Sequence, residues 1–330
     1  MTIVLSHISA LEYWLAPQGS KPAATLASES FQLPATSVSA ASLRTELPSG
    51  LALSRPLHVL TSKPVHESSE TIRHHARSAP SRSRTFFRIA DDVYVCSVEF
   101  AFMQVAERMD LIDLIRLGYE LCGTYSMRHG TQDGFHQRPS LTTVRKLKAY
   151  AVGSPRAHGR TKALRAVQYI HQGSASPAET RLAMNLLLPY RLGGFNLPHA
   201  TLNKMLELSP EERKLAQRRF LVCDVYWDKA RLGLEYDSDA HHVGAAKISA
   251  DAIRRNALTV GGTTVITITR AQYNNSILFA ETARSIAKML GTHVRPRCAD
   301  FEAKQRILRE TLHHDPEWAT RSTQQPLSDA

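Results

Sequence analysis

Acidic and histidine side chains are concentrated in one stretch of the sequence, VCDVYWDKARLGLEYDSDAHH, which begins at Val222. Residues 222–227 and 232–237 are predicted to form two strands, because apolar side chains dominate both and a short polar segment joins them. An ionised carboxylate on a half-buried sheet loses hydration unless another group compensates for it. A divalent cation is the simplest compensation, and several oxygen ligands suit Mg²⁺ or Mn²⁺. The residues that could share this chemistry are Asp224, Glu235, Asp237 and His241.

A further acid precedes these strands, at the start of a predicted helix over residues 174–188. Ser176 is a good N-cap, Pro177 suits the first helical position, and Glu179 lies at the third position after the cap. Glu179 therefore has two interpretations that the sequence leaves open. It is either a capping residue or an indirect ligand of the same cation.

Basic residues dominate the middle of the chain, since residues 134–178 contain no Asp or Glu. Two helices are predicted there, over 140–151 and 159–171, separated by Gly153-Ser154-Pro155. A helix with one sign of charge can follow the phosphates of a nucleic acid, and it can equally be a solvated surface. Both interpretations stay open. The candidate nucleic-acid contacts here are Arg145, Lys146, Lys148, Arg160, Lys162 and Arg165.

Local patterns predict the elements that would position these residues. Apolar periodicity and capping residues indicate helices, and runs of β-branched or aromatic residues indicate strands. The run TTVITIT is expected to be an interior strand, and residues 320–330 are expected to be disordered. The further predicted helices cover 6–15, 97–108, 111–121, 246–260 and 275–290; the further predicted strands cover 56–61, two segments of 86–96, and 263–269.

Composition limits the classes of protein. A chain of 330 residues with 43% hydrophobic residues is typical of a globular protein. Its net charge of +11 favours a polyanionic partner such as nucleic acid, and many basic proteins carry such a charge only to stay soluble. The 4 cysteines are scattered and form no CxxC pair, which predicts free thiols in a cytoplasmic protein. The sequence contains no apolar run long enough to span a membrane and no basic leader of a signal peptide.

The motifs of the C-terminal half resemble those of the PD-(D/E)xK nuclease superfamily. The resemblance rests on Glu179 on a helix, Asp224 on a strand, the segment LEYDSDAHH, a helix with Asp251 and Arg254, and then TTVITIT. More narrowly, this half is similar to very-short-patch-repair-like endonuclease domains of actinobacterial proteins. The N-terminal half resembles the region that accompanies such domains in AbiEi-like, antitoxin-type proteins, through SHISALEYW, PLHVLT and VYVCSVEFAFMQVAE.

This resemblance implies a fold and a site. Asp224 and Glu235 would bind Mg²⁺ or Mn²⁺, Glu179 would contact the ion through water, and His241 would transfer a proton or bind the scissile phosphate. Arg254, with Arg255 beside it, would contact the DNA. Two positions depart from the family pattern: Asp237 replaces the usual lysine, and Ser238 replaces a glycine. Locally, Asp237 could cap a turn, and Asp251 with Arg254 could be an ordinary helix pair.

We therefore expect an α/β protein with a C-terminal restriction-endonuclease-like mixed sheet flanked by helices and a smaller α+β N-terminal domain. The expected boundaries are 1–135 for the AbiEi-like region, 136–173 for a basic helical connector, 174–296 for the endonuclease-like domain and 297–330 for a tail. The expected function is metal-dependent hydrolysis of DNA. The alternative is a non-catalytic DNA-binding regulator with a degenerate nuclease fold. DNA is the expected partner and a homodimer is left open, with no nucleotide cofactor.

Overall fold

The chain forms two compact units. The computed structural model describes residues 2–39, 46–48, 51, 53–65, 69–77, 84–127, 134–237, 253 and 256–320. Unit 1 comprises Met1–Ile170 and His314–Ala330, and unit 2 comprises His171–His313. Both units mix helices with sheets, so the α/β class is confirmed.

Unit 1 is built on a six-stranded sheet with the order β2-β5-β6-β1-β3-β4. The pairs β1–β6 and β3–β4 are parallel, and the other pairs are antiparallel. Asp92, with a φ of 55°, lies in the turn between β5 and β6 that the sequence predicted. The strands are β1 (Ile3–Leu5), β2 (Thr25–Leu26), β3 (Leu57–Thr61), β4 (Ile72–Ala76), β5 (Phe86–Ala90) and β6 (Val93–Cys96).

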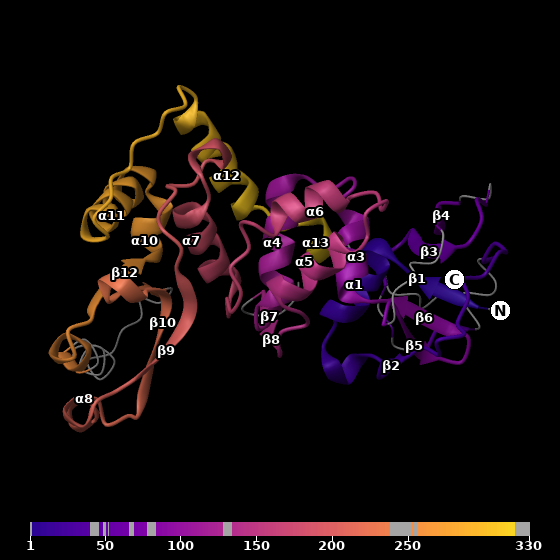
Figure 1. The fold of residues 1–330 in the computed structure, drawn as a ribbon, viewed down its shortest axis with the longest axis horizontal. Coiled ribbons are helices and arrows are strands. Elements are labelled where there is room, and N and C mark those ends of the chain that lie inside the picture. Colours follow the sequence, from indigo (N-terminus) through magenta and orange to yellow (C-terminus); the bar gives the residue numbers. More distant parts are fainter. Residues whose placement is uncertain are drawn as a thin grey trace. The chain divides into compact units, whose positions relative to one another are not determined.

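Helices cover this sheet and enclose the core of unit 1. Helix α1 packs against β3, β6 and α3, and α5 and α6 pack against α3 and α4 (Figure 1). Leu11, Phe100, Phe102 and Tyr119 are among the large side chains buried between these layers. The helices are α1 (His7–Leu15), η1 (Gln18–Ser20), α3 (Val98–Val105), α4 (Leu111–Cys122), α5 (Val144–Val152), α6 (Arg160–Ala166) and α13 (Glu317–Thr320), and a small hairpin is formed by β7 (Tyr125–Met127) and β8 (Phe135–Gln137).

The end of the described chain returns to unit 1. Trp318 of α13 is buried, and its indole N–H donates to Glu120 Oε2 at 2.9 Å. The guanidinium of Arg116 donates to the carbonyl of His314 at 2.7 Å. Helix α12 (Phe301–His313), which precedes this segment, belongs to unit 2. The segment expected as a tail over 297–330 therefore includes two ordered helices, one in each unit.

Unit 2 contains a four-stranded mixed sheet with the order β12-β11-β10-β9. β9, β10 and β11 are antiparallel, and β12 runs parallel to β11. Among the described strands β12 lies at an edge, so the expectation of an interior strand is wrong: its β-branched residues pair with β11 alone. The strands are β9 (Thr201–Glu207), β10 (Phe220–Trp227), β11 (Leu232–Asp237) and β12 (Thr264–Thr269).

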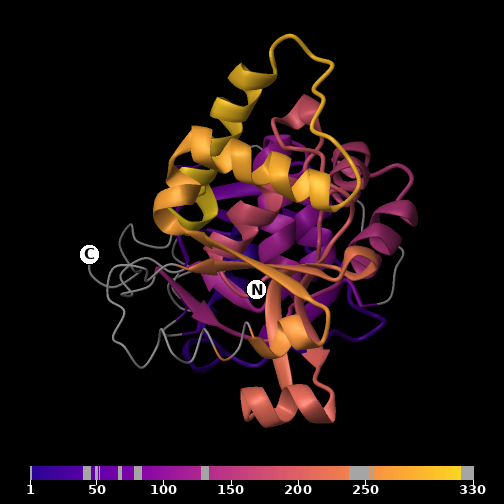
Figure 2. The same ribbon diagram turned by 90° about the vertical axis from the view of Figure 1, so that its left-hand side faces the viewer.

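The helices of unit 2 gather around one end of this sheet. The guanidinium of Arg309 in α12 lies over the rings of Tyr273 and Phe279 and donates to the backbone carbonyl of Tyr273. The hydroxyl of Tyr273 accepts a hydrogen bond from Asn185 Nδ2 at 2.9 Å. Helix α8 lies instead at the far end of β9 and β10, away from α11 and α12 (Figures 1 and 2). The helices are α7 (Pro177–Leu187), η2 (Tyr190–Leu192), α8 (Pro210–Ala216), η3 (Asp228–Ala230), α10 (Arg270–Asn274), α11 (Ser276–Met289) and α12.

The structure differs from the predicted boundaries in the middle of the chain. The segment expected as a connector, 136–173, contributes α5 and α6 to the packed core of unit 1, because Leu147, Tyr150 and Ala163 are buried there. The predicted helix over 246–260 lies mostly outside the described residues, as does 321–330. Cys96, Cys122, Cys223 and Cys298 are free thiols. Within the described ranges, none of the helices combines the length and hydrophobicity of a membrane span.

Candidate functional site

The hairpin of β10 and β11 brings Asp224 next to the acids of the second strand. The pairing Val225↔Leu234 fixes the register, and Asp224 and Glu235 are the next residues along the two strands. Asp224 Oδ2 accepts a hydrogen bond from the backbone N–H of Tyr236 at 2.7 Å. Because Tyr236 lies between Glu235 and Asp237, the Asp224 carboxylate reaches β11 where both other acids are attached.

The acids of this hairpin are half-buried, as expected for side chains at the margin of a core. Glu235 and Asp237 lie opposite Thr267 and Thr269 of β12. Among the described residues, neither Asp224 nor Glu235 belongs to a group of three or more histidine, cysteine or acidic residues whose ligand atoms lie within 4.8 Å of one another. His241, Arg254 and Arg255 lie outside the described residues.

Glu179 occupies a capping position at the start of α7. Its backbone N–H donates to Ser176 Oγ at 3.2 Å, and its carboxylate accepts from the Ser176 hydroxyl at 2.9 Å and from the Ala175 N–H at 2.8 Å. The same carboxylate also accepts from Asn203 Nδ2 of β9 at 2.5 Å. The neighbours of Asn203 on β9 pair with Cys223 and Val225, the two neighbours of Asp224. Glu179 thus connects the first turn of α7 to the strand beside Asp224.

The basic candidates of α5 and α6 fall into two groups. Arg145, Lys146 and Lys148 on α5 and Arg165 on α6 are exposed. Arg160 donates to the carbonyl of Ala151 at 3.1 Å, and Lys162 donates to the carbonyls of Glu107 and Met109 at 3.2 and 3.0 Å. The Ala151 carbonyl lies in the last turn of α5, and the carbonyls of Glu107 and Met109 follow the end of α3; helix ends leave acceptors without a partner inside the helix. Arg160 and Lys162 therefore cap backbone in unit 1.

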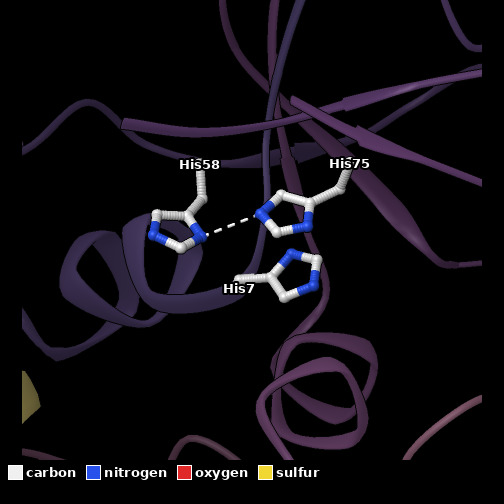
Figure 3. A group of neighbouring side chains, drawn as sticks. All are labelled: His7, His58 and His75. Carbon is white, nitrogen blue, oxygen red and sulfur yellow. Dashed lines mark hydrogen bonds between the residues drawn. The ribbon is translucent and has the colours of Figure 1, made fainter. Parts of the chain in front are cut away.

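Unit 1 contains a second group of chemically active side chains, His7, His58 and His75, which Figure 3 shows as three adjacent rings. Each offers one ring nitrogen, and these three atoms all lie within 4.8 Å of one another. Nδ1 of His58 and Nε2 of His75 share a hydrogen bond of 2.9 Å. The rings of His7 and His75 stack with centroids 3.7 Å apart. We call these three residues the histidine cluster.

Three elements of unit 1 position the histidine cluster. β3 and β4 are parallel, and His58 pairs with Arg73 while Leu60 pairs with His75. The side chains of His58 and His75 therefore lie on the same face of the sheet, offset by two residues along the strand direction. β1 pairs with β3 at Leu5↔Val59, and the chain then turns into α1, whose first residue is His7. The end of β1 therefore delivers His7 beside the two strands.

The surroundings of His7 and His75 lower the pKa values of both imidazoles. Burial lowers the pKa of His75 from 6.5 to about 4, and the positive charges of Arg108, Arg73 and Arg77 act in the same direction. Burial also lowers the pKa of His7 well below 6.5, with further contributions from His75 and His58. The cluster borders a cavity of about 210 Å³, which Arg73, Gln104 and Arg108 also line.

Sequence reasoning did not find the histidine cluster. His7, His58 and His75 are separated by tens of residues, and none belongs to a motif with metal-ligand spacing. The local signal was limited to HH at 74–75 in a basic strand, and it does not distinguish His75 from His74. His74 instead accepts a hydrogen bond from the Val38 N–H through Nε2 at 3.0 Å.

Comparisons with known proteins add no relatives. No family model matches this sequence, and neither the curated proteins nor the solved structures gave a match.

Proposed function

We propose that the protein is a metal-dependent DNA endonuclease whose site lies on the β10–β11 hairpin. The observation that carries the proposal is the contact of the Asp224 carboxylate with the backbone of β11 between Glu235 and Asp237. Acids that meet across neighbouring strands offer the oxygen ligands that Mg²⁺ and Mn²⁺ prefer. The PD-(D/E)xK resemblance remains part of this proposal.

The architecture of unit 2 supports the proposal. Its mixed sheet, with β9, β10 and β11 antiparallel and β12 parallel to β11, is flanked by α7 and by the helices after β12. A mixed sheet flanked by helices is the arrangement that the resemblance implies. The acids lie where β10 and β11 leave the paired part of the hairpin, so a substrate could approach them from the strand ends.

In this proposal each described residue has a separate role. Asp224 and Glu235 hold the ion, which when bound would lower the pKa of a coordinated water and neutralise charge on the phosphate. Their half-buried positions on adjacent strands and their carboxylate oxygens fit such an ion. Glu179 is a positioning residue, since its contacts hold Asn203 and the start of α7 beside β10. His241 is assigned proton transfer by resemblance alone.

The test is nicking of a supercoiled plasmid by the full chain with Mg²⁺ or Mn²⁺. Asp224→Asn and Glu235→Gln keep the side-chain volume and remove the charge, and each is expected to lower the rate about 100-fold or more, because metal stabilisation of the transition state amounts to several kcal/mol. Asp228→Asn is the matched control: this acid is exposed in the neighbouring turn and pairs with Lys204. Activity that survives both substitutions in the hairpin would refute the proposal.

A non-catalytic DNA-binding regulator is the second candidate. The observations that favour it are the capping contacts that Glu179 already makes and the presence of Asp237 where the family has lysine. Calorimetric titration with Mn²⁺ separates the two candidates without a substrate. If the protein is an endonuclease, the wild type is expected to bind Mn²⁺ at the hairpin, and Glu235→Gln is expected to abolish this binding. If it is a regulator, it is expected to bind duplex DNA without binding the ion at the hairpin.

A further inference from the structure

The histidine cluster of unit 1 has the composition of a transition-metal site. Neutral imidazole is a common ligand of zinc and of neighbouring late transition metals, and catalytic zinc sites use three protein ligands and leave a fourth position open. Three imidazole nitrogens within 4.8 Å of one another are close enough to converge on one ion. The set contains no carboxylate, which distinguishes it from the oxygen-rich ligand sets that magnesium and calcium prefer.

The hydrogen bonding directs lone pairs into the cluster. In the bond between Nδ1 of His58 and Nε2 of His75, one nitrogen donates a proton and the other accepts with its lone pair. One unprotonated nitrogen therefore faces a neighbouring ring, and the donor nitrogen can coordinate the same ion once its proton has moved to the other nitrogen of its ring.

Polar side chains contact the His7 ring and the backbone that carries His7 and His58. Ser6 Oγ lies 3.0 Å from His7 Nδ1, which leaves Nε2 of that ring for another partner. The backbone N–H of His7 donates to Gln104 Oε1 at 3.1 Å, and the N–H of His58 donates to Ser9 Oγ at 2.9 Å. Ser6, Ser9 and Gln104 are all buried. Supporting hydrogen bonds of this kind orient the ligands of metal sites.

The backbone of His7 provides a separate indication. Its φ is 50°, in the left-handed region that few residues other than glycine, asparagine, aspartate and histidine adopt. A side chain kept in a costly backbone conformation is more common at functional sites than in ordinary packing.

We propose that His7, His58 and His75 bind a divalent late transition-metal ion, of which Zn²⁺ is the first candidate, with a fourth position that faces the adjoining cavity. The fourth ligand is water or a small oxyanion. Three neutral ligands leave the full charge of the ion uncompensated, and Arg73 and Arg108 line the same cavity. An anion is therefore the partner that this charge distribution attracts.

The experiment uses the full chain, freed of metal with a chelator and then titrated with Co²⁺, a spectroscopic substitute for Zn²⁺. We expect one ion per chain at the histidine cluster, with ligand-field absorption of four-coordinate Co²⁺ that Zn²⁺ displaces and that inorganic phosphate alters. His58→Gln and His75→Gln are each expected to lower the affinity at least about 100-fold, since the removal of even a supporting residue costs 10- to 100-fold. Circular dichroism of each variant checks that it is folded.

Two matched controls separate this site from other binding. His199→Gln and His293→Gln each remove an exposed histidine of unit 2. Both are expected to keep the Co²⁺ spectrum and stoichiometry. X-ray absorption of the wild-type zinc form adds a test that needs no variant, with three imidazole nitrogens expected at about 2.0–2.1 Å. Absence of stoichiometric binding, a spectrum unchanged in His75→Gln, or a zinc shell without imidazole would overturn the proposal.

Discussion

At the scale of single residues, burial decides the charge of several histidines. His171 in unit 2 is an example outside both proposed sites. Burial lowers its pKa from 6.5 to about 4, the hydrogen bond to the Ala200 carbonyl opposes this shift, and nearby His199 adds to it. The bond from Nδ1 to that carbonyl is 3.0 Å long. The folded state favours the neutral form of His171, so this imidazole binds a proton more readily in the unfolded chain than in the folded chain.

This difference predicts a loss of stability in acid. Between pH 6.5 and pH 4 the unfolded chain binds a proton at His171 that the folded chain does not, so the free energy of unfolding falls as pH decreases. The contribution is about 1 kcal/mol per pH unit inside this window and is absent above it. His171→Asn keeps a donor for Ala200 and is expected to reduce the acid sensitivity in urea titrations at pH 7 and pH 5.

The exposed His293 supplies the control for this prediction. His293→Asn is expected to leave the pH dependence of the urea midpoint unchanged. If His171→Asn loses as much stability between pH 7 and pH 5 as the wild type does, the buried imidazole is not the source of the effect.

At the scale of elements, α5 and α6 show how one basic segment serves two purposes. Arg160 and Lys162 satisfy the carbonyls at helix ends within unit 1, so their charges contribute to the fold. Arg145 and Lys148 are exposed on α5, where Leu147 and Tyr150 occupy the buried face. The outer face of α5 is therefore one part of the basic segment that is available to phosphates.

The variant with both Arg145→Glu and Lys148→Glu tests this face. If α5 contacts DNA, the affinity of this variant for duplex DNA is expected to be lower than that of the wild type. The slope of log K against log salt is expected to become shallower by about 1 for each phosphate that the variant no longer neutralises. Fluorescence anisotropy at several salt concentrations measures both quantities. Lys63→Glu, an exposed lysine elsewhere in unit 1, is the control. An unchanged slope in the α5 variant would assign DNA binding to another surface.

At the scale of the whole molecule, the chain crosses between its two units twice. It leaves unit 1 after Ile170, forms unit 2, and returns at His314 to place Trp318 in the core of unit 1. The buried carboxylate of Glu120 accepts from the Trp318 indole and from the Met127 N–H at 2.8 Å. The contacts of Trp318 thus contribute to the stability of unit 1.

Removal of the indole N–H tests this dependence. Trp318→Phe keeps an aromatic ring and deprives Glu120 of one donor, so the free energy of unfolding is expected to fall by about 1–3 kcal/mol. Trp318→Ala also removes the packing and is expected to cost about 3–5 kcal/mol. Urea denaturation measures both variants. Equal stability of Trp318→Phe and the wild type would show that Glu120 does not need this donor.

Local features of the fold could be predicted from sequence because neighbouring residues determine them. Ser176 is an N-cap, as predicted, and accepts a hydrogen bond from the third residue of its helix; Ser97 caps its own helix in the same way. The strands over 222–227 and 232–237 were predicted within two residues of β10 and β11. Hydrophobic periodicity and helix capping depend on short segments, so helices and strands can be predicted from them without knowledge of the remaining chain.

By itself, then, the sequence determined the class of fold, the helix caps and the acid-bearing hairpin. Only the tertiary structure decided that His7, His58 and His75 meet, that Lys162 caps backbone carbonyls, and that Trp318 belongs to unit 1. It also placed β12 at an edge of the described sheet. These features depend on contacts between distant segments, and a side chain carries no local mark of the partner that folding will bring to it.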